Sequence, residues 1–242
     1  MQIRVLFFGV LKDLVGRSSE TLDLPEGARL QAVLSHYARQ APRFEAMLPS
    51  LAVSVNQEYS GPDCTLQGDD EVALLPPVSG GSGVAGSGVR IAREQISTQA
   101  ELDRLKLPQD GAAVVFEGVV RNNTRGRRTL YLDYEAYEAM ALKQMEALAQ
   151  KARSQFAVRD VAIVHRLGRL QIGETSVLIV VASAHRGPAF EACRWIIDTL
   201  KTKVPIWKKE YFEDGAVWAN GEPFPEEISL PAVTPNARPA SK

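Results

Sequence analysis

The sequence predicts an α+β protein of two domains, and three observations support this prediction. Short alternating apolar segments and one helical stripe fill the first 75 residues. A glycine- and serine-rich stretch, residues 80–88, then interrupts the pattern. A second series of strands and helices runs from about residue 89 to 222. The expected parts are therefore a first domain at 1–81, a linker at 82–88, a second domain at 89–222 and a proline-rich tail at 223–242.

Alternation of apolar and polar residues predicts four strands in the first domain. They are Gln2–Phe8, Glu20–Leu24, Leu51–Val55 and Glu71–Leu75. Leu11–Val15 predicts a short helical turn, and the apolar residues at 30, 33, 34 and 37 form one face of a helix. This order fits a small mixed sheet packed on one helix.

The second domain is predicted to contain three helices and four main strands. Its strands are expected at Ala112–Val120, Leu130–Glu135, Asp160–His165 and Ser176–Ala182. The first helix is expected at Gln95–Leu105, and the second around an apolar stripe at residues 137, 141, 145, 148, 152 and 156. The third is expected after Ser183, and its buried face is expected to hold Phe190, Cys193, Ile197 and Leu200. The helix that follows Ser183 is expected to close near Lys201. The chain then turns at Pro205, and Trp207 anchors a loop that holds Lys208.

Composition excludes several classes of protein. Apolar residues make up 45% and charged residues 24%, and there is no apolar run long enough to span a membrane. The first ten residues lack a basic leader and a small-residue cleavage site, so no signal peptide is expected. Cys64 and Cys193 have no metal-ligand spacing and indicate a reducing compartment, so we expect a cytoplasmic protein without a structural metal. No basic stripe interleaved with aromatic residues indicates nucleic-acid binding.

Charge differs between the two parts of the chain. Residues 1–81 carry 6 Lys or Arg against 10 Asp or Glu, a net −4, whereas residues 82–242 carry 22 against 19, a net +3. The difference fits attraction between the parts or an anion site in the second part, and scatter in small counts is the alternative.

Two prolines and two glycines end the first domain. Glycine lets a backbone approach a reactive centre closely, so residues 78–81 are either a slender tail or the start of a flexible linker. Three motifs, Val5-Leu-Phe-Phe-Gly9, Ala52-Val-Ser-Val-Asn-Gln57 and Gly68-Asp-Asp-Glu-Val-Ala-Leu-Leu-Pro-Pro-Val-Ser-Gly-Gly81, resemble the small subunit of molybdopterin synthase. That resemblance implies a ubiquitin-like β-grasp sulfur carrier whose final glycine bears a thiocarboxylate.

Gly81 is the matching glycine, but Ser82 follows it. A thiocarboxylate needs a free carboxyl end, so either a protease cuts after Gly81 or this domain is inert as a donor.

Basic residues gather at three places in the second domain. The segment Arg121–Arg128 has four arginines and is either a phosphate-binding loop or a solvated hairpin. His185 and Arg186 precede a helix N-terminus, which favours an anion but is also a common surface feature. Lys201, Lys203, Lys208 and Lys209 are either functional or the solvated end of a helix.

The motifs Phe116-Glu-Gly-Val-Val-Arg121, Ser183-Ala-His-Arg186 and Leu200-Lys-Thr-Lys-Val-Pro-Ile-Trp-Lys-Lys-Glu210 resemble the large subunit of molybdopterin synthase. The resemblance implies an α/β hammerhead fold, a dimer of large subunits and a small subunit docked at each end. The residues that it implies as catalytic or substrate-binding are Arg121, His185, Arg186, Lys201, Lys208, Lys209 and Glu210.

The implied reaction transfers sulfur from the Gly81 thiocarboxylate to cyclic pyranopterin monophosphate, forming the dithiolene of molybdopterin without a metal or organic cofactor. Neighbouring positive charges disfavour the ammonium form of a lysine, so Lys201 is the first candidate for general acid/base and Lys208 the second. An adenylyltransferase that activates the Gly-Gly end is the further implied partner. The alternative is a non-catalytic sulfur-carrier or scaffold fusion.

Helix geometry adds an expectation about assembly. His185 and Lys201 flank one helix of about 15 residues, which places them on the order of 20 Å apart. We therefore expect a homodimer through the second domain, with Lys201 and Lys208 of one protomer facing His185 and Arg186 of the other.

Overall fold

The computed structural model describes residues 1–40, 42–77 and 88–219. The chain separates into two compact units that change over in sequence at Pro76 and Pro77, and each is described by itself. Gly81, most of the expected linker and the expected tail at 223–242 lie outside the described residues. The sequence predictions about cleavage and about the tail are therefore not addressed by the structure.

The first unit is a five-stranded mixed sheet with helices on one face. Its strands are β1 (Gln2–Phe7), β2 (Ser19–Asp23), β3 (Ala52–Val55), β4 (Glu58–Tyr59) and β5 (Glu71–Leu75), in the order β2-β1-β5-β3-β4. The pair β1 and β5 is parallel, and the pairs β1–β2, β3–β5 and β3–β4 are antiparallel. Its helices are α1 (Val10–Val15), α2 (Leu30–Gln40), α3 (Pro42–Met47) and the 3-10 turn η1 (Leu48–Ser50).

Alternation along the strands produces the core of the first unit. Ile3, Val5 and Phe7 point to one face of β1 and pack with Leu30, Val33, Leu34 and Tyr37 of α2. The ring of Tyr37 meets Phe7 edge-on, and its hydroxyl donates to Glu20 Oε1 at 2.5 Å. The predicted mixed sheet on one helix is confirmed, with β4 and α3 as additions.

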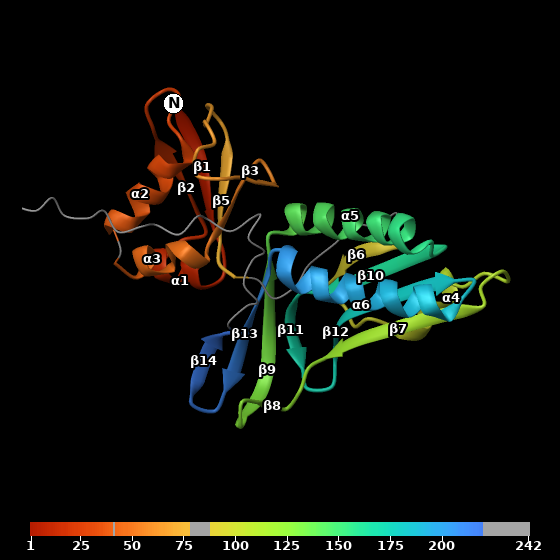
Figure 1. Cartoon of the computed structure of the whole chain (residues 1–242). Helices are drawn as coiled ribbons and strands as arrows, with labels where there is room; N and C mark the ends of the chain where they lie inside the picture. The colour runs from red at the N-terminus through yellow and green to blue at the C-terminus, as the bar shows by residue number, and fades with distance from the viewer. Residues whose placement is uncertain (41, 78–87, 220–242) are drawn as a thin grey trace, which may run out of the picture. The chain divides into compact units, whose positions relative to one another are not determined.

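The second unit is built on a four-stranded sheet in the order β6-β10-β12-β7. Its strands are β6 (Val89–Ala92), β7 (Ala112–Val119), β10 (Asp160–Arg166) and β12 (Thr175–Ser183). Two long helices, α5 (Glu138–Phe156) and α6 (Arg186–Lys203), cover one face, and the short α4 (Thr98–Leu105) packs on the other (Figure 1). The two faces are apolar because alternate strand residues supply each of them.

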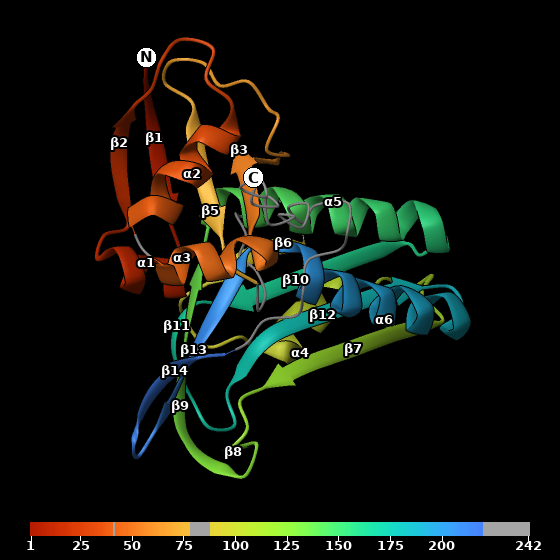
Figure 2. The same cartoon turned by 60° about the vertical axis from the view of Figure 1, so that its left-hand side comes forward.

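A second sheet extends from this layer in the order β11-β9-β13-β14, with β8 paired to β9. Its strands are β8 (Asn123–Thr124), β9 (Arg127–Ala136), β11 (Gly168–Gln171), β13 (Ile206–Phe212) and β14 (Gly215–Trp218). All of its pairs are antiparallel. The ten-residue strand β9 forms its centre together with β13 (Figure 2). The α+β class expected from the sequence is confirmed.

Two local predictions are wrong. Phe190 was expected on the buried face of its helix, but it is 61% exposed, because its turn of α6 directs Ala189 and Ala192 to the core. The rest of the buried face is Cys193, Ile196, Ile197 and Leu200, as expected for Cys193, Ile197 and Leu200. Residues 206–210 were expected to form a loop, but they are the first part of β13, paired along β9. Within the described ranges, the helices are too short or too polar to cross a membrane.

Candidate active site

Helix α6 carries predicted site residues at both of its ends. His185 is its N-cap, in an extended conformation, and its ring makes no capping bond. Arg186 begins the helix and Lys201 lies in its last turn, and all three side chains are exposed. His185 and Lys201 are 16 residues apart along the helix, which corresponds to about 24 Å at 1.5 Å per residue. The helix predicted between these groups is confirmed.

Strand pairing places Arg121 at the end of the four-stranded sheet where the last turn of α6, with Lys201, also lies. Strand β12 ends at Ser183, beside the first residue of β7, while β7 ends at Val119, beside Thr175. Helix α6 starts just after Ser183 and runs back along β12 and β7, as both views show (Figures 1 and 2). Its last turn therefore lies at the end of β7 from which Arg121 continues. His185 and Arg186 lie at the opposite end.

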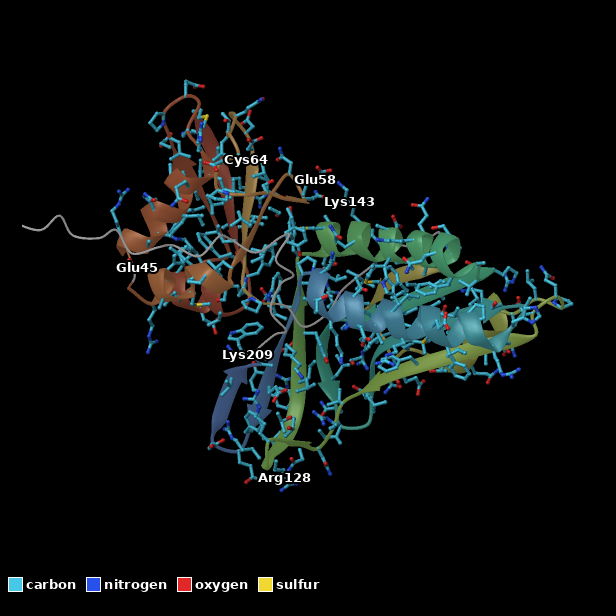
Figure 3. The ribbon with its side chains drawn as sticks, viewed as in Figure 1. Glu45, Glu58, Cys64, Arg128, Lys143 and Lys209 are labelled. Atoms are coloured by element: carbon cyan, nitrogen blue, oxygen red, sulfur yellow. The ribbon has the colours of Figure 1, made fainter. Side chains whose placement is uncertain are left out.

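The arginine-rich segment after β7 is a hairpin, and two of its arginines are engaged. Arg127 pairs with Asp214 at 2.5 Å and stacks on the ring of Phe212. Arg128, the second residue of β9 (Figure 3), pairs with Glu213 at 3.0 Å. The four arginines therefore do not form one phosphate site. Of this segment, Arg121 and Arg125 are left without an ion-pair or ring partner among the described residues.

Most basic side chains of the second unit have partners, and the exceptions are informative. Within residues 88–219, four cationic side chains have no hydrogen bond, ion pair or ring contact with another described residue. These are Arg121, Arg125, Arg186 and Lys201. Three of the four are predicted site residues. Unpaired cations are available to an anionic ligand, whereas paired ones must first give up a carboxylate.

Lys208 and Lys209 point to opposite faces of β13, because side chains alternate along a strand. Lys208 lies opposite Tyr134 of β9, and its Nζ is 3.1 Å from Oε1 of the buried Glu210. Lys209 lies opposite Trp218 of β14, with Nζ 5.1 Å from the centre of that ring (Figure 3). The sequence placed Lys208, Lys209 and Glu210 in one pocket segment, but only Lys208 and Glu210 share a face.

Two other reactive side chains of this unit are structural. His165 is buried, and burial lowers its pKa to about 3, so the ring is neutral and its Nδ1 donates to the carbonyl of Arg166 at 3.0 Å. Burial raises the pKa of the Cys193 thiol to about 11, which leaves it protonated and unreactive. In the described ranges, no cluster of three or more His, Cys, Asp or Glu side chains is placed to hold a metal.

The structure adds one side chain that the sequence did not indicate. Tyr134 is half-buried, faces Lys208 across the strand pair and packs edge-on against His165, with 5.1 Å between the ring centres. Its position depends on the register of β9 with β13, and a lone tyrosine in an alternating strand gives no signal of that register.

Comparison with known proteins identifies both units. Residues 5–81 match the family model described as the ThiS family, and residues 91–203 match the model described as MoaE protein. The molybdopterin synthase catalytic subunit of Thermoplasma volcanium is 46% identical over 127 residues, which cover 52% of this chain and 93% of that protein. The protein of the same name from Oryza sativa subsp. japonica is 42% identical over 135 residues, covering 54% of this chain and 70% of that protein.

Solved structures agree with these relatives. Molybdopterin synthase from Staphylococcus aureus matches with a TM-score of 0.53 and 40% identity, covering 55% of this chain and 98% of that chain. A complex of subunits 1 and 2 of the molybdopterin-converting factor from Helicobacter pylori matches with a TM-score of 0.50 and 26% identity, covering 58% and 96%. The resemblance to both subunits is confirmed, and the chain belongs to the molybdopterin synthase family, with a ThiS-type sulfur-carrier domain preceding a MoaE-type sulfurtransferase domain in one polypeptide.

Proposed function

We propose that this chain converts cyclic pyranopterin monophosphate to molybdopterin, with sulfur supplied by a thiocarboxylate at Gly81. The observation that carries the proposal is the union of a sulfur-carrier domain and a synthase domain in one chain. The substrate carries a cyclic phosphate and is an anion. The unpaired cations Arg121, Arg186 and Lys201 suit such a ligand, and guanidinium groups match phosphate oxygens in geometry.

Each transfer requires bond changes that the proposal accounts for. In each transfer the thiocarboxylate sulfur attacks a carbon of the pterin side chain, which links Gly81 to the substrate as a thioester. At one carbon the bond to an oxygen of the cyclic phosphate breaks, so the ring opens and the phosphate stays on the product as a monoester. At the other carbon the carbonyl oxygen leaves as water, which forms the carbon–carbon double bond of the dithiolene. Water then cleaves the acyl–sulfur bond, leaving sulfur on the pterin and a carboxylate on Gly81. Two such transfers complete the dithiolene.

Lys201 is the proposed general acid/base, and Lys208 assists it at the reacting end of the substrate. The roles of Arg121, His185 and Arg186 are to hold the anion. Lys209 is the weakest of the proposed binding residues, because it lies on the other face of β13 and stacks on Trp218.

The active site is proposed to be shared between two copies of the second domain. Arg121 and Lys201 lie at one end of the layer formed by α6, β7 and β12, and His185 and Arg186 lie at the other. One small substrate cannot bridge about 24 Å. A two-fold dimer brings opposite ends together and forms two equal sites.

The donor end requires processing, because Gly81 is followed by Ser82. We propose cleavage after Gly81 in the cytoplasm, followed by activation of the new carboxyl end by an adenylyltransferase. Intact mass of the protein isolated from its native cell tests this step. A fragment ending at Gly81, heavier by the replacement of one oxygen with sulfur, is the expected result. An active, uncut species as the only form would refute it.

Turnover tests the function itself. The protein isolated from its native cell is expected to convert cyclic pyranopterin monophosphate to a dithiolene product detectable by mass spectrometry. Failure to convert it, with the donor end shown to be thiocarboxylated, would overturn the proposed reaction.

A further inference from the structure

We propose that Glu210 is a positioning residue that fixes the Lys208 ammonium in place, and that it does not bind substrate. The inference rests on the proposed function, since Lys208 acts in that reaction. It departs from the sequence-based expectation, which assigned Glu210 to substrate binding.

The contact between the two side chains is direct. Oε1 of Glu210 lies 3.1 Å from Nζ of Lys208, and both residues lie on the same face of β13, two positions apart. The strand is paired on both sides, with β9 and β14, so its backbone is held in register along this segment. The spacing of the two Cα atoms is therefore set by the sheet.

Burial differs sharply between the partners. The Glu210 side chain is 6% exposed, whereas that of Lys208 is 28% exposed. Glu210 is flanked across the strand pair by Leu132, which packs with Leu170 and Val120 in a small apolar cluster. The carboxylate thus lies inside the sheet layer, and the ammonium extends past it toward solvent.

This arrangement argues against substrate binding by Glu210. A carboxylate repels an anionic substrate, and one so far from solvent has little surface to offer a ligand. A buried charge is costly unless it is paired, and the pairing observed is with Lys208. The lysine stem has four rotatable carbons, so an ammonium without this partner would sample many positions.

A fixed ammonium is useful where a reacting atom must be met in one geometry, because misplacement of a catalytic group by about 1 Å can reduce rates a hundredfold. Glu210 would act on the reaction through Lys208 alone. Loss of its charge should therefore lower the maximal rate and leave the half-saturating substrate concentration unchanged.

Two substitutions test the inference in protein isolated from its native cell, with cyclic pyranopterin monophosphate as substrate. Glu210→Gln keeps the shape and removes the charge. Glu210→Asp keeps the charge and withdraws it by one methylene, so it avoids leaving Lys208 without a counter-charge. Both are expected to lower the maximal single-turnover rate by about 10- to 100-fold, the usual effect of losing an orienting partner.

Glu101 provides a matched control. Its side chain is 8% exposed and pairs with Arg90 at 2.8 Å and Arg104 at 2.6 Å, in helix α4 on the face of the sheet opposite α6. Glu101→Gln is expected to lower the unfolding free energy while keeping the wild-type rate. A drop in rate in this control as large as that of Glu210→Gln would show that loss of any buried carboxylate suffices, and would overturn the inference.

A double substitution separates positioning from binding. If Glu210 acts through Lys208, then Lys208→Ala with Glu210→Gln should be no slower than Lys208→Ala alone. Additive losses, a raised half-saturating concentration at an unchanged rate, or a wild-type rate in Glu210→Asp would each overturn the inference. An inactive wild-type protein would instead refute the proposed function.

Discussion

Replacement of Lys201 by alanine should separate turnover from stability. Lys201 is exposed in the last turn of α6 and has no hydrogen-bond, ion-pair or ring partner among the described residues, so its removal breaks no such interaction there. Exposed substitutions usually change the unfolding free energy by about 0.5 kcal/mol, and loss of a cation near a helix C-terminus costs about 0.3–1 kcal/mol. Alanine recovers part of this through its higher helix propensity. The variant should therefore unfold within about 1 kcal/mol of wild type.

The effect on rate should be much larger. Loss of a general acid/base costs about 100- to 10,000-fold, which corresponds to about 3–5 kcal/mol of activation free energy. The assay is formation of the dithiolene product from cyclic pyranopterin monophosphate, with urea unfolding measured on the same samples.

Arg194→Ala is the matched control for Lys201→Ala. It removes another exposed cation of α6, whose partner is Asp198 at 3.7 Å, and should keep the wild-type rate. A folded Lys201→Ala protein that retains more than about a third of the wild-type rate would show that Lys201 is not the acid/base.

Three further predictions follow from the second unit. Lys201→Ala and Arg186→Ala proteins, each inactive alone, should regain about a quarter of wild-type activity when they are unfolded and refolded together. Half of the refolded dimers are mixed, and each mixed dimer has one intact site out of two. No recovery would contradict a shared site. Arg159 donates to Asp110 at 2.6 and 2.7 Å and holds the pKa of that carboxyl below its usual range. The pair therefore stabilises the fold by about 1.5–3 kcal/mol at neutral pH, and this stabilisation is lost as pH falls through the folded-state pKa. Asp110→Asn should lower the free energy of urea unfolding at pH 7 and weaken its dependence on acid pH. Met145→Ala, at a fully buried position between α5 and the sheet, should cost about 2–5 kcal/mol in the same measurement.

Local periodicity in the sequence predicted the elements that pack against one core. The stripe from Tyr137 to Phe156 corresponds to α5, and the strands β7, β10 and β12 lie where alternation or apolar runs placed them. Strand β13 was missed because Ile206–Phe212 contains two adjacent lysines and a glutamate, a pattern typical of a surface loop. Pairing with β9 and β14 decides its structure, and such pairing is not a local property.

The residue types of the site could be predicted from motifs, but their relations could not. His185, Arg186 and Lys201 were recognised together with their separation, since helix length alone fixes the latter. Glu210 was recognised, yet its partner was not, because a contact between side chains on one face requires knowing that the segment is a strand.

The two candidate lysines differ in a way that only the fold reveals. In sequence, Lys201 and Lys208 are two basic residues on either side of a proline, and both could end a helix in solvent. In the structure, Lys201 has no partner within the described part of the chain, whereas Lys208 is held by a buried carboxylate. A free ammonium can approach an incoming anion and exchange a proton with it, while a held one supplies a fixed positive charge at a set point. This difference is why we assign proton transfer to Lys201 and electrostatic stabilisation to Lys208.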